Sequence, residues 1–371
     1  MTKDFKTPGQ LIKQVLKERG LTQRTLAGVI GLSTSHISEI INDKRSVTAS
    51  LASKISECLE IPIAALIDLQ TRRALEKSIG SQETDLENAA KSKLSEYDNV
   101  VCVKSLLKSA GTKRTSYSEK LAWIEHHYGI SDPKIVCEQS SLLISENFRK
   151  SAKTGLDGRM IATWVIKARA KAKSHKVTAR FNINDKDFLK DDLAAALHRN
   201  ENTLNIVHEI LNSYGIGFAV VEKEPNASID GYSFMNEQTP YIVITKRFDR
   251  IDNLAFTIMH ELGHIVLGHL SEVNSKINIY FGDNGEEDPH PQERAANEFA
   301  ANALIPCDLW RFAPSVPLWS QAIQRKYTLW ANKYRLNQWI VLGRVSHETG
   351  MYRFKSDQSR KIQGDYNPLK M

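Results

Sequence analysis

An apolar stretch at residues 253–270 constrains this chain more than any other feature, because it sets three polar groups among hydrophobic ones. Read as a helix, it has hydrophobic side chains on nearly every side, a pattern typical of a buried helix. These side chains are Phe256, Ile258, Met259, Leu262, Ile265, Val266 and Leu267. The polar groups are His260, Glu261 and His264. Burying such a group without a partner costs on the order of several kcal/mol, so the fold must supply partners for all three.

The spacing of the two histidines predicts that they share a partner. His260 and His264 are four residues apart, which places them on one face of a helix, one turn from each other. Two imidazoles so placed can bind one zinc ion (Zn²⁺), and the adjacent Glu261 can act on a water bound to that ion. The alternative is a pair of hydrogen-bonded core histidines without a metal. His269 lies off this face, and we expect it to have a structural role.

A catalytic zinc ion needs a third protein ligand and keeps one position open for water. The pattern predicts a helix at 292–304, and the inward face of this helix carries the carboxylate of Glu293. Asn297, one turn later, could accept a hydrogen bond from the free ring N–H of a ligating histidine. Other candidates lie well round the helix or on a polar loop: Glu298, Glu286, Glu287, Asp288 and His290. Glu293 is the predicted third ligand, and the alternative is an ordinary carboxylate near the positive end of a helix.

The composition is that of an ordinary globular protein. A length of 371 residues suggests two or three domains, and 41% hydrophobic and 25% charged residues are usual proportions. The net charge of +7 permits a nucleic-acid partner. The four cysteines form no CxxC pair, which argues against a cysteine–zinc knuckle and against a disulfide framework. Because the sequence shows no signal segment and no apolar run of spanning length, we expect a cytoplasmic protein without a membrane partner.

Residues 8–70 predict five short helices, two of which form a helix-turn-helix. Thr22 begins a helix at 23–30, Gly31 makes a turn, and Ser33 begins a helix at 34–42. Side chains on and beside the second of these helices are of types suited to base edges and phosphates: Gln23, Thr34, Ser35, His36, Ser38, Lys44 and Arg45. The fifth helix is expected at 62–69. The alternative is a small helical bundle used only for dimerisation.

The whole pattern predicts a mainly α protein with a small antiparallel β-sheet, an α+β fold. We expect a DNA-binding domain at 1–70, a solvated helix plus linker at 71–100, a helical middle region at 101–204, a domain at 205–350 and a polar tail at 351–371. Segments at 217–221, 231–235 and 241–245 are rich in β-branched and aromatic residues and predict the strands. The third is expected at an edge, where an extended peptide could pair.

The N-terminal motif resembles the XRE/Cro-type repressor helix-turn-helix. The resemblance rests on Leu21-Thr-Gln23, Leu26-Ala27 and the run from Gly31 to Arg45, about a sixth of the chain, and the opening Pro8-Gly9 resembles the HigA branch of antitoxins. It implies binding to a two-fold double-stranded DNA operator as a homodimer. Asp43 stands where the turn usually has glycine, and Glu39 stands where a base-contacting side chain is expected, so the sequence preference stays open.

The second half resembles the ImmA/IrrE metallopeptidases over roughly residues 205–350. The motifs are His260-Glu261-Leu-Gly263-His264 and Glu293-Arg-Ala-Ala-Asn297. The resemblance implies a gluzincin-like fold with His260, His264 and Glu293 on zinc and Glu261 as general base. Ala295 replaces a second acidic residue that many members carry. The family's best-known members cut XRE-type repressors.

Together these features predict a DNA-binding regulator, an antitoxin-like repressor, with a zinc-dependent peptidase domain that cuts a protein partner or repressor. One alternative is a non-catalytic transcriptional antitoxin whose metal domain is structural or binds a cognate toxin. Another is the peptidase toxin of a toxin–antitoxin pair. The site residues are complete in every case, so the sequence leaves these alternatives open.

Overall fold

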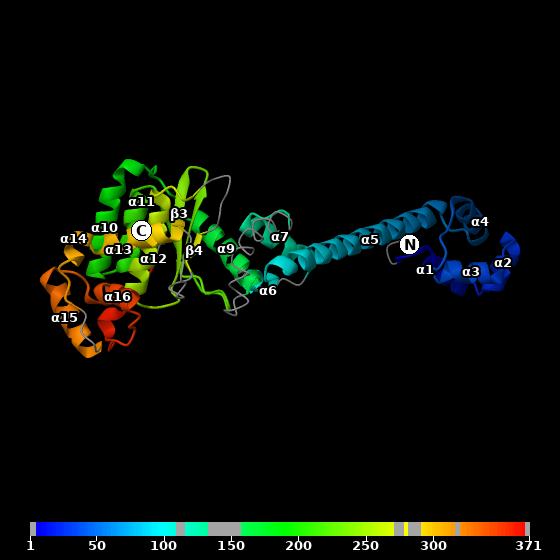
Figure 1. The fold of residues 1–371 in the computed structure, drawn as a ribbon. Helices are drawn as coiled ribbons and strands as arrows, with labels where there is room; N and C mark the ends of the chain where they lie inside the picture. The colour runs from blue at the N-terminus through cyan, green and yellow to red at the C-terminus, as the bar shows by residue number, and fades with distance from the viewer. Residues whose placement is uncertain are drawn as a thin grey trace. The chain divides into compact units, whose positions relative to one another are not determined.

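The computed structural model describes residues 5–108, 116–132, 157–270, 278–280, 291–315 and 320–367. The chain forms two compact units, Met1–Ser92 and Lys93–Met371, and the boundary falls within helix α5 (Ile63–Val100). The described part is mainly helical with one small sheet, which confirms the α+β prediction (Figure 1). Within it, no helix has both the length and the hydrophobicity needed to span a membrane.

The first unit contains the predicted helix-turn-helix. Its helices are α1 (Pro8–Glu18), α2 (Gln23–Ile30), α3 (Thr34–Ile41), α4 (Ala49–Leu59) and the start of α5. The side chains of Thr22 and Ser33 accept hydrogen bonds from backbone N–H groups in the first turns of α2 and α3, as predicted for N-caps. Gly31 ends α2 with a φ of 74°, a left-handed conformation that glycine adopts at little cost.

A turn after α3 holds three helices of this unit together. Asp43 stands there with a φ of 59°, which asparagine and aspartate tolerate better than most residues do. The Thr7 hydroxyl at the start of α1 donates to Asp43 Oδ2 at 2.6 Å, and Arg73 of α5 donates to the backbone oxygen of Asp43. Gly9 lies so close that a Cβ there would be 2.6 Å from the backbone oxygens of Ile40 and Ile41. The turn therefore fixes the end of α3 against α1 and α5.

Helix α5 is much longer than the sequence pattern suggests. The sequence predicts a fifth helix at 62–69, but the helix continues to Val100, so the whole segment predicted as helix plus linker is helical. The segment is rich in alanine, leucine, glutamate and lysine, which have high helix propensity, and it contains no proline. Polarity alone did not distinguish a linker from an exposed helix.

The second unit is built on a four-stranded sheet with the order β1-β3-β2-β4. The strands are β1 (Gly217–Val221), β2 (Gly231–Asn236), β3 (Thr239–Thr245) and β4 (Asn278–Tyr280). β2 is antiparallel to both β3 and β4, but β1 runs parallel to β3, so the expected all-antiparallel sheet is wrong in this pair. β3 is central, not an edge strand, because the connection after β1 carries β2 to the far side of β3. An added peptide strand therefore cannot pair with β3.

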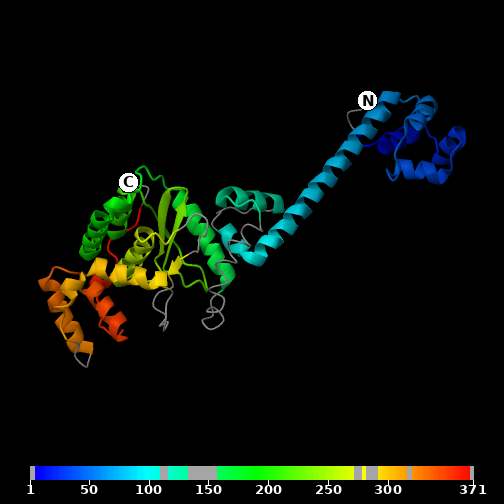
Figure 2. The same ribbon diagram turned by 45° about the horizontal axis from the view of Figure 1, so that its top comes forward.

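Helices cover both faces of this sheet (Figures 1 and 2). Helix α9 (Gly158–Lys173) packs on one face, where Trp164 contacts the layer of Tyr232 and Val243. Helices α11 (Thr203–Ser213) and α12 (Ile251–Val266) pack on the other face, over Phe218 and Ile242. Strand alternation explains this division, because successive side chains point to opposite faces. The metal-binding candidate helix is thus pressed between the sheet and further helices.

The remaining helices complete the second unit. α10 (Lys186–Arg199), α13 (Pro291–Leu304), α15 (Ser320–Lys333) and α16 (Gln338–Thr349) join the core around α12, and α6 (Val103–Lys108) and α7 (Tyr117–Tyr128) pack with α9. Short elements are α14 (Cys307–Trp310), η1 (Ile183–Asp185) and η2 (Gln358–Arg360). Residues 101–204, predicted as a separate helical middle region, therefore belong to the second unit: α9 packs on the strands, and α10 packs in the core around α12.

The C-terminal residues to 367 lie against this unit, although their sequence suggests a polar tail. Phe354 and Ile362 are buried in the core around α12. Arg360 donates to the buried carboxylate of Asp252, at the start of α12, at 2.7 Å, and Asn200 donates to the backbone oxygen of Lys361 at 2.8 Å. These contacts make the segment part of the folded unit.

His198 joins three helices in a way that predicts a pH-dependent stability. Its Nε2–H donates to the backbone oxygen of Leu304 at 2.7 Å, and its Nδ1 accepts from the backbone N–H of Asn337 at 3.1 Å. Both bonds require the neutral ring, and burial lowers the pKa of His198 from 6.5 despite the bond to Leu304. In the unfolded chain His198 has the ordinary pKa of 6.5, and in the folded protein its pKa is lower. The stability that depends on neutral His198 is therefore fully present above about pH 6.5 and is lost as the pH falls from there through the pKa of the folded state.

We expect His198→Ala to lower the free energy of unfolding of this unit by about 2 kcal/mol at about pH 8, because two backbone groups lose their partner. The loss of unfolding free energy should be smaller at about pH 5.5. At that pH the ring is protonated in the unfolded chain, so keeping it neutral in the folded wild type already lowers its stability. Denaturant unfolding at both pH values measures this. His126→Ala, an exposed control in α7, should change little. An equal or larger loss at the lower pH would contradict the assignment.

Candidate metal centre and nucleic-acid interface

Helix α12 buries its polar residues completely. His260, Glu261 and His264 each have no exposed surface, and Ile258, Met259 and Leu262 around them are equally buried. The hydrophobic residues force the helix into the core, and the polar groups enter with it. Each of the three must then find a partner inside the protein.

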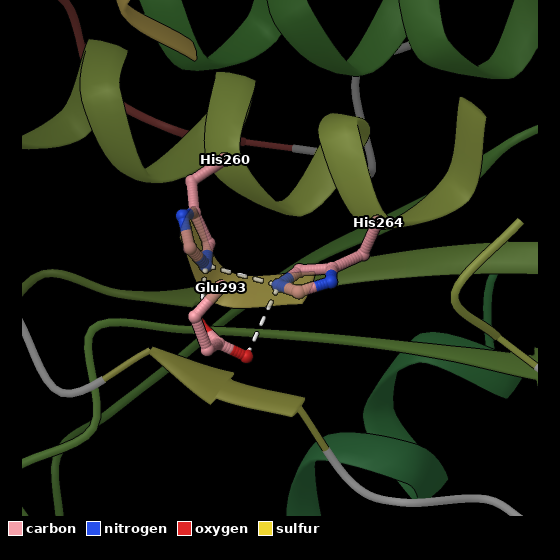
Figure 3. Close-up of side chains that lie close together, drawn as sticks. All are labelled: His260, His264 and Glu293. Atoms are coloured by element: carbon pink, nitrogen blue, oxygen red, sulfur yellow. Dashed lines mark hydrogen bonds and ion pairs between the residues drawn. The ribbon is translucent and has the colours of Figure 1, made fainter. Parts of the chain in front are cut away.

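The structure brings His260, His264 and Glu293 together, so that one potential ligand atom from each lies within 4.8 Å of the others. The Nε2 atoms of the two histidines are 3.0 Å apart. Glu293 Oε2 is 3.2 Å from His260 Nε2, and Glu293 Oε1 is 3.5 Å from His264 Nε2. Figure 3 shows the three side chains turned toward one another, with both rings extending from α12. Glu293 comes from the first turn of α13, which packs along α12.

A hydrogen bond at Nδ1 of His260 determines which of its two ring nitrogens carries the hydrogen. His260 Nδ1 is 2.8 Å from Asn297 Oδ1, one turn after Glu293 on α13. An amide oxygen only accepts, so Nδ1 carries the hydrogen and donates. In the neutral ring the lone pair is then on Nε2, toward His264 and Glu293. The sequence had placed Asn297 in this position relative to a ligating histidine.

His264 has an equivalent contact that the sequence analysis missed. Its Nδ1 is 3.0 Å from His269 Nδ1. Gly268, with a φ of 71°, turns the chain back at the end of α12, and the backbone N–H of His269 donates to the backbone oxygen of His264. Helical periodicity would place His269 away from the face of His264. It does not apply here, because α12 ends at Val266. Gly268 is the signal in the sequence, because a glycine in a left-handed conformation commonly ends a helix.

Charge also favours a ligand set at this position. Burial would raise the pKa of the Glu293 carboxyl, but the hydrogen bonds and positive charge that protonated His260 and His264 would supply outweigh it and hold that pKa well below its usual value. The carboxylate is therefore ionised beside a cation, whether that cation is a proton on the rings or a metal ion. Burial lowers the pKa of His260, although Glu293 opposes this effect. Both directions give neutral His260 and ionised Glu293, the forms that bind a metal ion.

These residues fit a zinc ion by donor type and by spacing. Two imidazole nitrogens and a carboxylate form one of the usual catalytic ligand sets of zinc. Ligand atoms at about 2.0–2.1 Å from one tetrahedral ion lie about 3.3 Å from each other. The separations of 3.0, 3.2 and 3.5 Å between His260, His264 and Glu293 are close to that value. The structure brings together the three residues predicted as ligands, and their binding of a metal ion stays a prediction.

Glu261 faces the sheet from the same helix. Its Oε2 accepts a hydrogen bond of 2.6 Å from the hydroxyl of Ser233 in β2. Gly231, two residues earlier on the same face of β2, permits this approach, because a Cβ there would lie 2.7 Å from Glu261 Oε1 and 2.6 Å from Thr257 Cγ2. Sequence analysis did not identify Ser233 or Gly231. Strand alternation places both on one face, but only the fold shows that this face meets Glu261.

The other ligand candidates are not in the cluster. Glu298 is exposed on α13, as its place on the helix predicts. Glu286, Glu287, Asp288 and His290 lie outside the described residues.

The predicted DNA-contacting residues lie on and around α3. Thr34, Ser35, Lys44 and Arg45 are exposed, and three more are partly exposed: Gln23, His36 and Ser38. Two of the expected contacts already have partners. Arg45 forms an ion pair of 3.2 Å with Glu39, and Asn42 donates to the Ser38 backbone oxygen and hydroxyl. Glu39 therefore has a partner within the protein, which explains an acidic residue at this position.

Gly231→Ala should lower the free energy of unfolding of the second unit by about 1–3 kcal/mol, because the added methyl overlaps Thr257 and Glu261 in a packed interior. Gly28→Ala is the control. Nothing lies within 4 Å of a Cβ at Gly28, and this glycine is inside α2, so alanine there should be neutral or stabilise by up to about 1 kcal/mol. Denaturant unfolding of both variants measures the difference. A neutral Gly231→Ala would contradict the close contact.

Comparison with known proteins agrees with both halves of this description. The family model described as Helix-turn-helix matches residues 12–66, and the model described as IrrE N-terminal-like domain, a peptidase family, matches residues 215–327. A search of curated proteins finds no match.

Two solved structures of PrgX are among the structural matches. The PrgX/iCF10 complex has 16% identity and a TM-score of 0.16, with 56% of this chain and 73% of the other covered. A PrgX point mutant has 13% identity and a TM-score of 0.18, with 89% and 96% covered. These scores are too low to support an argument. The family matches show an N-terminal helix-turn-helix domain of the XRE type and a C-terminal domain of the IrrE type; they do not test the resemblance to the HigA branch, which stays a prediction.

Proposed function

We propose that this protein is a DNA-binding regulator, an antitoxin-like repressor, whose second unit is a zinc-dependent peptidase that cuts a protein partner or repressor. The observation that carries the proposal is the convergence of His260, His264 and Glu293 in a domain that matches a peptidase family. We assign DNA binding to residues 1–70 and hydrolysis to residues 205–350. Because a DNA-binding regulator acts on DNA inside the cell, a cytoplasmic location belongs to the same proposal.

His260, His264 and Glu293 would hold the zinc ion, and Asn297 and His269 would orient the two rings. Bound there, zinc supplies Lewis acidity, which acidifies water and polarises a peptide carbonyl. Glu261 is the proposed general base, which removes a proton from the attacking water and passes it to the leaving amine. The Ser233 hydroxyl holds one carboxylate oxygen of Glu261 and limits its rotation.

For the first unit we propose that α3 enters the major groove of an operator. Thr34, Ser35, His36 and Ser38 would contact base edges, and Gln23, Lys44 and Arg45 would contact phosphates. Of the four side chains proposed for base edges, the two that are exposed, Thr34 and Ser35, lie at the N-terminus of α3, which supports this orientation. Operators of this kind are two-fold, so a homodimer belongs to the proposal.

Two variants test the peptidase. Glu261→Gln should retain zinc and abolish cleavage, because it removes the base and leaves the three ligands. Glu293→Ala should lose zinc as well as cleavage, because a ligand is missing. Elemental analysis of the purified chains gives the zinc content, and mass spectrometry of cell proteins gives the new termini. Termini present with the wild type and absent with Glu261→Gln would identify both activity and substrate. Equal termini with both chains would exclude this mechanism, and zinc without any new termini would favour a binding module.

The DNA proposal predicts affinity that falls steeply as salt rises. Lys44→Ala should weaken binding to every duplex tested and reduce the slope of log K against log salt by about one, because one phosphate contact is lost. Lys77→Ala, an exposed lysine on α5, is the charge-matched control and should leave the slope unchanged. Fluorescence anisotropy with labelled duplexes across a salt series measures both. A salt-independent affinity of the wild type would rule out the proposed contacts.

A further inference from the structure

Helix α12 is open to solvent at one point beside the proposed zinc site. From Leu254 to Ile265 every residue of the helix is buried except Phe256, which is partly exposed. Its neighbours Ala255 and Ile258 have no exposed surface. A large aromatic side chain on such a helix is expected to be buried as completely as its neighbours. Phe256 is therefore the place where another molecule can reach this part of the helix.

Phe256 continues the face of α12 that carries the two candidate histidine ligands. Phe256, His260 and His264 follow one another at intervals of four residues, so their side chains lie in one row along the helix. The ring centroids of Phe256 and His260 are 6.3 Å apart, with 30° between the ring planes. Glu293, the third candidate ligand, keeps 29% of its side chain exposed, so the cluster is itself accessible. A side chain of a molecule bound at the cluster can therefore reach Phe256.

A second ring, that of His347 in the last turn of α16, lies against Phe256. The two ring centroids are 6.1 Å apart and the ring planes differ by 26°, which is within the range of offset-stacked aromatic pairs. His347 is exposed, although Val345 and Ser346 just before it are buried. The two rings, here called the Phe256–His347 wall, thus join a partly buried ring to an exposed one beside the metal cluster.

Contacts one turn earlier fix the position of this wall. Gly343 lies one turn before His347, and a Cβ added there would be 3.0 Å from the Cβ of Asp252, which lies one turn before Phe256. Because α16 approaches α12 so closely at Gly343, the next pair of residues along the two helices also meets. Arg344 ties α16 to the end of α13, where it donates to two backbone oxygens at 3.1 and 2.8 Å. The wall therefore belongs to the same rigid packing as the candidate ligands.

We propose that the Phe256–His347 wall is a subsite of the peptidase that takes a large apolar side chain, aromatic by preference, next to the bond to be cut. The inference rests on the proposed function, because the wall lies beside the substrate only if the substrate binds at the zinc site. An apolar ring laid on Phe256 removes exposed hydrophobic surface from water, and a planar ring adds the contacts that aromatic pairs prefer. Arg344 and Glu348 on the same turn of α16 form an ion pair of 2.9 Å, so neither adds an unpaired charge to the wall.

Isothermal titration calorimetry of the full chain loaded with zinc tests the wall. The probes are the hydroxamates of N-acetylphenylalanine and N-acetylglycine, which bind zinc through the same group and differ only in the side chain. The phenylalanine probe should bind at least about tenfold more tightly. The zinc-free chain is the control for binding elsewhere, and a phenylalanine probe that binds it as tightly would overturn the proposal. Tighter binding of the N-acetylaspartate α-hydroxamate than of the phenylalanine probe would overturn the proposed side-chain class.

Variants of both rings locate the preference, which is the ratio of the two dissociation constants. Phe256→Ala should reduce this ratio to below about threefold, and His347→Ala should reduce it at least about threefold, because each removes one ring. His347→Phe keeps a ring and should preserve the ratio, which separates the ring from its ionisable nitrogens. Phe312→Ala is the matched control, a phenylalanine of the same unit with 74% exposure, and should leave the ratio unchanged. An unchanged ratio in either alanine variant of the wall overturns the proposal.

Zinc content separates failure of the metal site from failure of the wall. A wild-type chain that takes up no zinc overturns the proposed function, and this inference with it. A chain that takes up zinc and binds both probes equally overturns the wall alone and leaves the proposed peptidase intact. Since His347 is exposed, its variants leave the core unchanged, and circular dichroism with zinc analysis confirms that each variant keeps its fold and its metal.

Discussion

Two imidazole nitrogens 3.0 Å apart, with a carboxylate beside them, form the interaction on which the second unit depends. Each group is costly to bury alone, and together they form a set that a cation stabilises. Helix α12 carries both rings into the interior because its other side chains are hydrophobic. The sheet on one side and α13 on the other then have to be placed so that His260, Glu261 and His264 each meet a partner.

The partners come from three separate parts of the second unit. Glu293 and Asn297 stand one turn apart on α13, so a single helix supplies both a ligand candidate and the group that orients His260. His269 reaches His264 through the turn at Gly268, and Ser233 reaches Glu261 from β2. These contacts restrict the rotation of the rings and of the carboxylate before any ligand binds. Such restriction is what a precise site requires of its surroundings.

In the first unit the equivalent role falls to one aspartate. Asp43 ends the recognition helix in a left-handed turn and joins it to Thr7 and Arg73. The residue that departs from the glycine usual at this turn thus adds contacts that glycine could not make. It also ties the orientation of α3 to that of α5.

Local patterns in the sequence determined most of the elements and the ligand candidates. Hydrophobic periodicity and capping residues specify α2 and α3, and helical spacing selects His260, His264 and Glu293, because these depend on neighbours a few residues away. Only the tertiary structure decided the strand order, with β3 in the centre, and the contacts of Ser233 and His269. It also decided that α5 continues through a polar segment and that the C-terminal residues pack on the core. These features depend on contacts between residues distant in the chain, and the periodicity of one segment carries no information about its distant partner.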